Sequence, residues 1–215
     1  MEEVPEETPD EIELLFQEAR DLERDGRVQD AGRLYREIIA REPQHLKARN
    51  NLGVLQDRSG SHAAALEHFR AALEVEPENP EILANLGAAL ASMARFEEAE
   101  KVLRKAMRLD PGRADVRANL GILFFRRGLY QQAEAELKWA CERDPDHGPA
   151  HFYRGEALNR LGRIDEALDA LEEAARLQPR NGKIYYVMGI LYDQKHLPVE
   201  AGVMYRRARE LSGRG

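Results

Sequence analysis

Apolar residues recur every three or four positions in segments of about fourteen residues, and these segments come in pairs along the chain. A break separates the two members of a pair, and in four pairs it falls at a glycine: Gly26, Gly60, Gly128 and Gly162. A period near 3.6 is typical of an amphipathic helix, and glycine often follows a helix's last turn. The pattern therefore predicts an all-α fold of helix-turn-helix pairs.

The pairs repeat at a fixed interval of 34 residues. A proline closes five of them, at Pro43, Pro77, Pro111, Pro145 and Pro179. Since proline cannot continue a helix, each one marks the end of a second helix. The interval gives six copies, near residues 12–45, 46–79, 80–113, 114–147, 148–181 and 182–213. Such a period is typical of stacked repeats, in which each copy buries the apolar face of its neighbours.

Small residues keep the same interval inside the predicted helices. The first helices carry Gly53, Gly87, Gly121, Gly155 and Gly189, with Ala19 in the first copy, and the second helices carry Ala31, Ala65, Ala99, Ala133, Ala167 and Ala201. A glycine inside a helix costs ~1 kcal/mol relative to alanine, so its recurrence needs a packing reason. We expect each small residue of a first helix to lie opposite the recurring alanine of the second, so that the two backbones approach closely.

These residues and their spacing resemble the tetratricopeptide repeat family. In the third copy the match runs through Asn85-Leu86-Gly87, Ala99, Ala106 and Pro111, and the resemblance covers roughly residues 11–213. It implies a right-handed α-solenoid superhelix of six repeats, with the first helices lining a concave groove. Residues 1–10 are then expected to be an acidic flexible tail, and residues 11–215 a single repeat domain. The family's tryptophan early in the first helix is replaced by Leu15, Arg49, Leu83, Arg117, His151 and Tyr185.

Composition narrows the possible partners and location. A formal net charge of −7 argues against nucleic-acid binding, because nucleic-acid binders usually present a basic face to phosphates. No stretch approaches the ~18 uninterrupted apolar residues of a membrane helix, so no membrane insertion is expected. One cysteine cannot form an internal disulfide, and the acidic start of the chain is unlike a secretory signal. We therefore predict a cytoplasmic protein.

Candidate catalytic and cofactor chemistry is weak. None of the six histidines lies beside a credible serine or cysteine nucleophile, and Cys141 falls in a buried register. His147 and His151 have the i, i+4 spacing of helical metal ligands, but Pro149 is expected to open the helix and leave His147 outside it. The sequence therefore predicts no enzyme activity, no cofactor and no metal site.

Two polar rows fall on the first helices, on the side that the resemblance assigns to the groove. One row contains Asn51, Asn85 and Asn119, followed in the same register by Tyr153 and Val187. A primary amide both donates and accepts, so this row suits the backbone of an extended peptide, although asparagine is also the family's usual choice there. The other row contains Arg58, Arg126 and Arg160. These arginines would attract an acidic segment, or would pair with neighbouring acids such as Glu23 and Asp57.

Apolar residues occupy a groove register that the family generally keeps polar. They are Val54, Ala88, Ile122 and Ile190, with Phe125, Phe152, Tyr186 and Val187 nearby. Exposed apolar residues that gather in one place usually mark a contact surface, here for an apolar or amphipathic segment. The alternative is that some of them pack between adjacent first helices.

The leading hypothesis is a non-enzymatic scaffold that binds an extended or helical protein segment in its groove. A second hypothesis is a self-assembling, homo-oligomeric protein whose groove accepts the acidic tail or a helix of another copy. A third is a regulatory repeat fragment of a larger enzyme. Fold alone does not decide among the three, because one repeat architecture serves unrelated functions.

Overall fold

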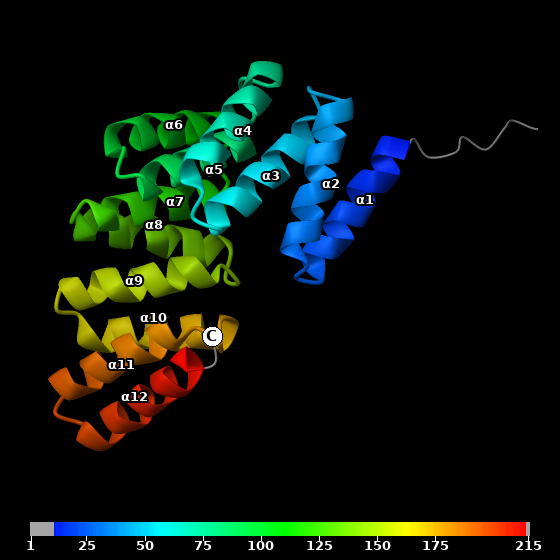
Figure 1. Ribbon diagram of the computed structural model, residues 1–215. Helices are drawn as coiled ribbons and strands as arrows, with labels where there is room; N and C mark the ends of the chain where they lie inside the picture. The colour runs from blue at the N-terminus through cyan, green and yellow to red at the C-terminus, as the bar shows by residue number, and fades with distance from the viewer. Residues whose placement is uncertain (1–10, 214–215) are drawn as a thin grey trace, which may run out of the picture. The chain divides into compact units, whose positions relative to one another are not determined.

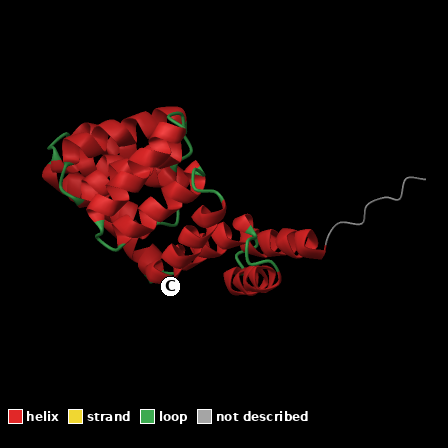
Figure 2. Cartoon of the chain, turned by 90° about the horizontal axis from the view of Figure 1, so that it is seen from above, coloured by secondary structure: helices red, strands yellow, loops and turns green. Residues whose placement is uncertain are grey.

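The computed structural model describes residues 11–213, and the predicted acidic tail at residues 1–10 lies outside them. Every regular element in the described residues is an α-helix, joined to the next by a short loop (Figures 1 and 2). The described residues form two compact units, unit 1 up to Arg95 and unit 2 from Phe96. The division falls between the two helices of the third predicted repeat.

Unit 1 contains α1 (Glu11–Arg24), α2 (Val28–Arg41), α3 (Leu46–Arg58), α4 (His62–Val75) and α5 (Pro80–Ser92). Within it α1 packs on α2 and α3 on α4, and each hairpin contacts the next element along the chain. Its core is centred on Phe16, Tyr35, Ile38 and Leu52, all with 4% or less of their surface exposed.

Unit 2 contains α6 (Phe96–Leu109), α7 (Ala114–Arg126), α8 (Tyr130–Arg143), α9 (Gly148–Arg160), α10 (Ile164–Leu177), α11 (Gly182–Gln194) and α12 (Pro198–Ser212). Helices α7 to α12 form three hairpins that succeed one another in chain order (Figure 1). The first helices α7, α9 and α11 also contact each other in sequence. This nearest-neighbour stacking is the arrangement that the 34-residue interval predicts.

The turn inside each hairpin needs one residue with positive φ. Gly26, Gly60, Gly128 and Gly162 supply it with φ between 74° and 83°, as the breaks in the apolar pattern predict. Ala94 and His196 occupy the equivalent places with φ of 58° and 59°. The next amide then bonds back to the last turn, for example from Arg95 N to the Leu90 carbonyl at 3.0 Å. Ala94 and His196 therefore complete the same helix C-terminal motif without glycine's conformational freedom.

The helix-interior glycines permit the close approach that the sequence predicts, with one correction to the pairing. A Cβ built on Gly121 would lie 2.5 Å from Leu137 Cγ, whereas the backbone oxygen of Ala133 is 3.2 Å away. Gly155 has the same relation to Leu171 and Ala167, at 2.6 and 3.1 Å. The closest partner is thus the large side chain four residues after the recurring alanine. The alanine matters because its small side chain lets the two backbones come this close.

Three of the residues at the place of the missing tryptophan link consecutive repeats through hydrogen bonds. Arg49 Nε donates to the carbonyl of Pro43 at 2.5 Å, and Tyr185 Oη donates to that of Pro179 at 3.3 Å. His151 Nε2 lies 3.0 Å from the carbonyl of Pro145. In each case the acceptor is the proline that closes the preceding repeat, so a polar side chain satisfies the end of one hairpin from the start of the next.

Candidate functional site

A cleft with a volume of about 430 Å³ opens in unit 1 on the first helices α1, α3 and α5. Its lining residues are Glu13, Phe16, Gln17, Arg20, Leu46, Lys47, Asn50, Asn51, Asn79, Glu81 and Ile82. The cleft is largely polar, with apolar side chains only at Phe16, Leu46 and Ile82. Such a lining suits a hydrated, hydrogen-bonding ligand rather than an apolar one.

Amide side chains on α3 and α5 form a hydrogen-bonded chain beside this cleft. Asn50 Nδ2 donates to Glu81 Oε1 at 3.1 Å, and Asn85 Nδ2 donates to Asn50 Oδ1 at 2.9 Å. Asn50 is almost fully buried, while Asn51 and Asn85 are partly exposed. The Glu81 carboxylate therefore holds the amides of two helices in fixed orientations. Prediction from the sequence placed Asn85 in the row but not Asn50 or Glu81.

Asn51 is held from the other side by the second helix of the first hairpin. Its Nδ2 donates to Tyr35 Oη at 3.1 Å, and Tyr35 Oη in turn donates to Glu23 Oε2 at 3.2 Å. Burial, together with the Glu23 carboxylate, raises the pKa of Tyr35 to about 12, so the phenol keeps its proton and remains a donor. This chain of bonds leaves Oδ1 of Asn51 without a donor among the described residues.

The cations of unit 1 differ in how they are paired. Arg58 of the predicted row lies 3.4 Å from Glu23, which is the acid-paired alternative considered from the sequence. Arg20 and Lys47, which line the cleft, are exposed and have no carboxylate within 4.0 Å in the part of the chain described. Lys47 lies four residues before Asn51 on α3, so the two side chains lie on the same face of the helix. This spacing in the sequence could have identified Lys47 as a residue of the cleft.

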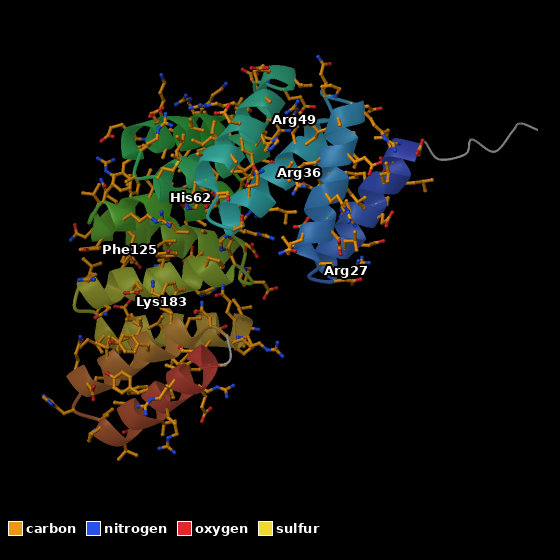
Figure 3. The ribbon with its side chains drawn as sticks, viewed as in Figure 1. Arg27, Arg36, Arg49, His62, Phe125 and Lys183 are labelled. Carbon is orange, nitrogen blue, oxygen red and sulfur yellow. The ribbon has the colours of Figure 1, made fainter. Side chains whose placement is uncertain are left out.

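Unit 2 has an apolar strip, which we define as Ile122, Phe125, Tyr153, Tyr186 and Ile190. The ring of Phe125 on α7 meets that of Tyr153 on α9 edge to face, with centroids 5.5 Å apart. Tyr186 is 55% exposed and the other four side chains are partly exposed. Phe125, labelled in Figure 3, belongs to α7. The strip is therefore accessible, and its aromatic pair is already packed before any partner binds.

Two residues predicted for a binding surface are buried instead. Phe152 and Val187 each expose only 5% of their surface and belong to the core of unit 2. The Lys183 ammonium lies 5.1 Å from the centroid of the Phe152 ring. These two side chains pack between adjacent first helices, which is the alternative that the sequence left open. They are therefore covered by the protein itself and are not available to a ligand.

The remaining predicted residues are accessible to different extents. Val54, Ala88 and Asn119 are partly exposed, and Arg126 is exposed at the end of α7. Arg160 is exposed, with its guanidinium 6.0 Å from the Tyr130 ring centroid. Val54 and Ala88 belong to unit 1, whereas Asn119, Arg126 and Arg160 belong to unit 2.

The structure gives His147 and Cys141 surroundings that explain them without catalysis or metal binding. His147 is the residue before α9, and its Nδ1 accepts from the Ala150 amide at 3.1 Å, so it caps the helix rather than facing His151. Cys141 is buried, and burial raises the pKa of its thiol to about 11. Across residues 11–213, no three His, Cys, Asp or Glu side chains gather where they could hold a metal ion. None of the described helices is long and apolar enough to cross a bilayer.

Comparisons with known proteins identify the repeat. The family model described as "Tetratricopeptide repeat" matches residues 118–182, and the model of the cilia and flagella-associated protein 70 middle TPR-like domain matches residues 15–119. No curated protein sequence matches the chain significantly.

Solved structures show the same fold. A chain of MamA from Desulfovibrio magneticus RS-1 that runs from residue 41 to the end is 23% identical, with a TM-score of 0.63 over 78% of this chain and 94% of that one. A tetratricopeptide repeat protein from Parabacteroides merdae is 18% identical, with a TM-score of 0.75 over 95% of this chain and 80% of that one. Cut9–Hcn1 of the APC/C is 16% identical, with a TM-score of 0.84 over 95% of this chain and 44% of that one. The helical hairpins, their 34-residue interval and these matches together place the chain in the tetratricopeptide repeat family.

Proposed function

We propose that this chain is a non-enzymatic scaffold whose unit 1 cleft binds an extended, acidic polypeptide segment. The tetratricopeptide repeat fold is in general a scaffold for contacts between proteins. The observation that carries the finer proposal is the pair of cations, Arg20 and Lys47, which line the cleft without a carboxylate partner in the described chain. In a chain with more acidic than basic residues, a basic side chain without an acid beside it is available for a partner's acid.

The amides of the cleft would bind the peptide backbone. Asn51 is oriented by Tyr35, and Asn85 by the Asn50 and Glu81 pair. Because these bonds hold the two Nδ2 groups, the Oδ1 atoms are the parts of the side chains that face a peptide's N–H donors. A pre-oriented acceptor loses little conformational entropy on binding, which favours affinity.

The experiment compares fluorescein-labelled twelve-residue peptides of equal length that are acidic, neutral or basic, with binding followed by fluorescence anisotropy. We expect the acidic peptide to bind best, and Arg20→Glu with Lys47→Glu to weaken it by tenfold or more, because both attractions become repulsions. The control is Lys138→Glu with Arg206→Glu, which makes the same change of net charge at two exposed positions in unit 2. Equal binding of the acidic and basic peptides, or equal losses in the two variants, would contradict the proposal.

The apolar strip of unit 2 is a separate candidate surface for the hydrophobic side chains of a partner. Ile122 and Ile190 lie at its two ends in chain order, on α7 and α11. With a leucine-rich amphipathic peptide as the probe, Ile122→Asp with Ile190→Asp should abolish binding and leave the helical circular dichroism unchanged. Retained binding would exclude the strip without affecting the cleft of unit 1.

A further inference from the structure

The second and fourth repeats carry an arginine at the same position, but only the arginine of the fourth has a carboxylate partner. Arg117 on α7 and Arg49 on α3 occupy equivalent places 68 residues apart. Arg117 Nη1 donates to Glu136 Oε2 of α8 at 3.1 Å, and its guanidinium stacks 4.2 Å from the Trp139 ring centroid. At the place equivalent to Glu136, α4 carries His68. The arginine of unit 1 has therefore lost the carboxylate that its counterpart in unit 2 has.

The head of Arg49 is nevertheless held in place. Its Nε donates to the carbonyl of Pro43 at 2.5 Å, and the side chain is partly buried. That bond leaves the two Nη groups as donors, and they have no carboxylate within 4.0 Å among residues 11–213. Most arginines of the hairpins around it differ in this respect, although Arg20 also has no carboxylate within 4.0 Å among the described residues. Arg24, Arg27, Arg33, Arg41, Arg58 and Arg70 each have an acidic partner.

A second unpaired arginine reaches the same region from α2. Arg36 Nη2 lies 3.5 Å from the point where a Cβ on Gly32 would stand, and Leu52 of α3 lies 3.9 Å from that point. The guanidinium therefore lies where α2 meets α3. Figure 3 labels Arg36 and Arg49 on these two neighbouring helices. In the described chain, Arg36 has no carboxylate within 4.0 Å.

His68 completes the group from α4. Its Nδ1 is buried and has no hydrogen-bond partner in the described structure. Burial lowers the pKa of His68, and the charges of Arg49 and Arg36 lower it further, against the opposing effect of Glu67. Both arginine charges thus act on this imidazole, and at neutral pH the site is two fixed cations beside a neutral ring.

We propose that Arg36, Arg49 and His68, from three consecutive helices, form a binding site for a phosphate group. Guanidinium groups match the oxygens of phosphate in pairs, and the imidazole adds a third donor from α4. A single carboxylate is sufficient for Arg117, but here two cations lack an acid, and a dianion neutralises both. The phosphate belongs either to free inorganic phosphate or to a phosphorylated side chain of a protein. This site is independent of the cleft on α1, α3 and α5.

The test follows the histidine Cε1–H resonances by NMR while inorganic phosphate is added, with sodium chloride at the same ionic strength as the reference for screening. His68 is assigned by its loss in His68→Gln. We expect phosphate to shift the His68 resonance and to raise the pKa of His68, because a bound anion favours the protonated ring, while His147 and His196 respond no more than they do to chloride. Arg36→Gln and Arg49→Gln should each weaken binding by about tenfold.

The chain itself suggests the matched control. His68→Glu restores the carboxylate that Glu136 provides in unit 2, so it should fold, and it should abolish phosphate binding by occupying the site from within. Since the His68 signal is absent from this variant, binding is measured by calorimetry in all variants. Phosphate binding that persists in His68→Glu, with normal helical circular dichroism, overturns the proposal.

The source of the phosphate is decided by a second titration with N-acetyl-phosphoserine amide, and acetate tests the alternative of a simple carboxylate site. Binding of either phosphate compound supports the site, and the tighter one identifies its source. Equal binding of acetate and phosphate, or no shift of His68 beyond that caused by chloride, overturns it.

Discussion

Gly121 provides the sharpest test of why glycine recurs inside the first helices. In Gly121→Ala the new Cβ would lie 2.5 Å from Leu137 Cγ, 3.0 Å from Leu137 Cδ2 and 3.2 Å from the backbone oxygen of Ala133. Leu137 is fully buried, and Cγ is a branch point rather than a flexible end, so the side chain cannot move aside cheaply. The helix α7 would have to move away from α8.

The expected magnitude comes from two opposing contributions. Replacing glycine by alanine in a helix stabilises by ~1 kcal/mol, whereas overpacking a core costs about 1–3 kcal/mol. Because the contact falls well below van der Waals distance, we expect the upper end of that range and a net loss of about 2 kcal/mol. Gly121→Leu should lose several kcal/mol, since a longer side chain enlarges the same overlap.

Gly202 on α12 is the matched control, because a Cβ there meets nothing within 4 Å and the residue is exposed. Gly202→Ala should therefore stabilise by up to ~1 kcal/mol from helix propensity alone. Urea unfolding is followed by circular dichroism for the whole chain and by the fluorescence of the single tryptophan, Trp139, for the α7–α8 hairpin. If Gly121→Ala is stabilised as much as Gly202→Ala, close backbone approach is not the reason for the glycine.

Two further predictions concern the turns and the buried imidazole of His151. Ala94→Gly and His196→Gly should each raise the free energy of unfolding by about 0.5–1 kcal/mol, because glycine adopts a positive φ without strain. Gly26→Ala should lower it by a similar amount, and all three are measured by urea unfolding. A lower free energy of unfolding in Ala94→Gly would show that the alanine is not strained. Burial lowers the pKa of His151, so the unfolded chain takes up its proton first and stability should fall as pH drops below about 7. The urea midpoint should fall less between pH 7.5 and 5.5 in His151→Gln than in the wild type, and equal falls would show that His151 does not contribute.

The 34-residue interval determines most of the fold in advance, because it repeats the same buried positions from copy to copy. One register shows this in five of the six copies: Ala48, Ile82, Val116, Ala150 and Ile184 each expose 1% or less, whereas Leu14 at the same place in the first copy is 54% exposed. A periodic pattern is not informative where one copy departs from the others. Ala94 and His196 adopt positive φ without glycine because the flanking helices impose the turn, which no local sequence signal indicates.

The candidate site was harder to predict, because the packing of neighbouring first helices decides which side chains remain exposed. Phe152 and Tyr186 share one register, yet Phe152 is 5% and Tyr186 55% exposed. Phe152 is covered because α11 packs on α9, whereas no described first helix follows α11. The same register holds Asn50, whose burial beside Glu81 is tolerated only because both bonds of the amide are made within unit 1.

Equivalent positions in the repeats of the two units have different partner residues. At the position of the family's tryptophan, Arg49, His151 and Tyr185 bond to the preceding proline's carbonyl. For the arginines at this position, the neighbour in the following helix differs: it is the acid Glu136 for Arg117 but His68 for Arg49. In unit 2 the Glu136 carboxylate neutralises the charge of Arg117 within the fold. In unit 1, where His68 takes the place of the carboxylate, the charge of Arg49 remains for a ligand. A backbone shared by all copies can therefore carry binding sites in some of them, because changing one partner residue alters the local charge without altering the packing that holds the repeat together.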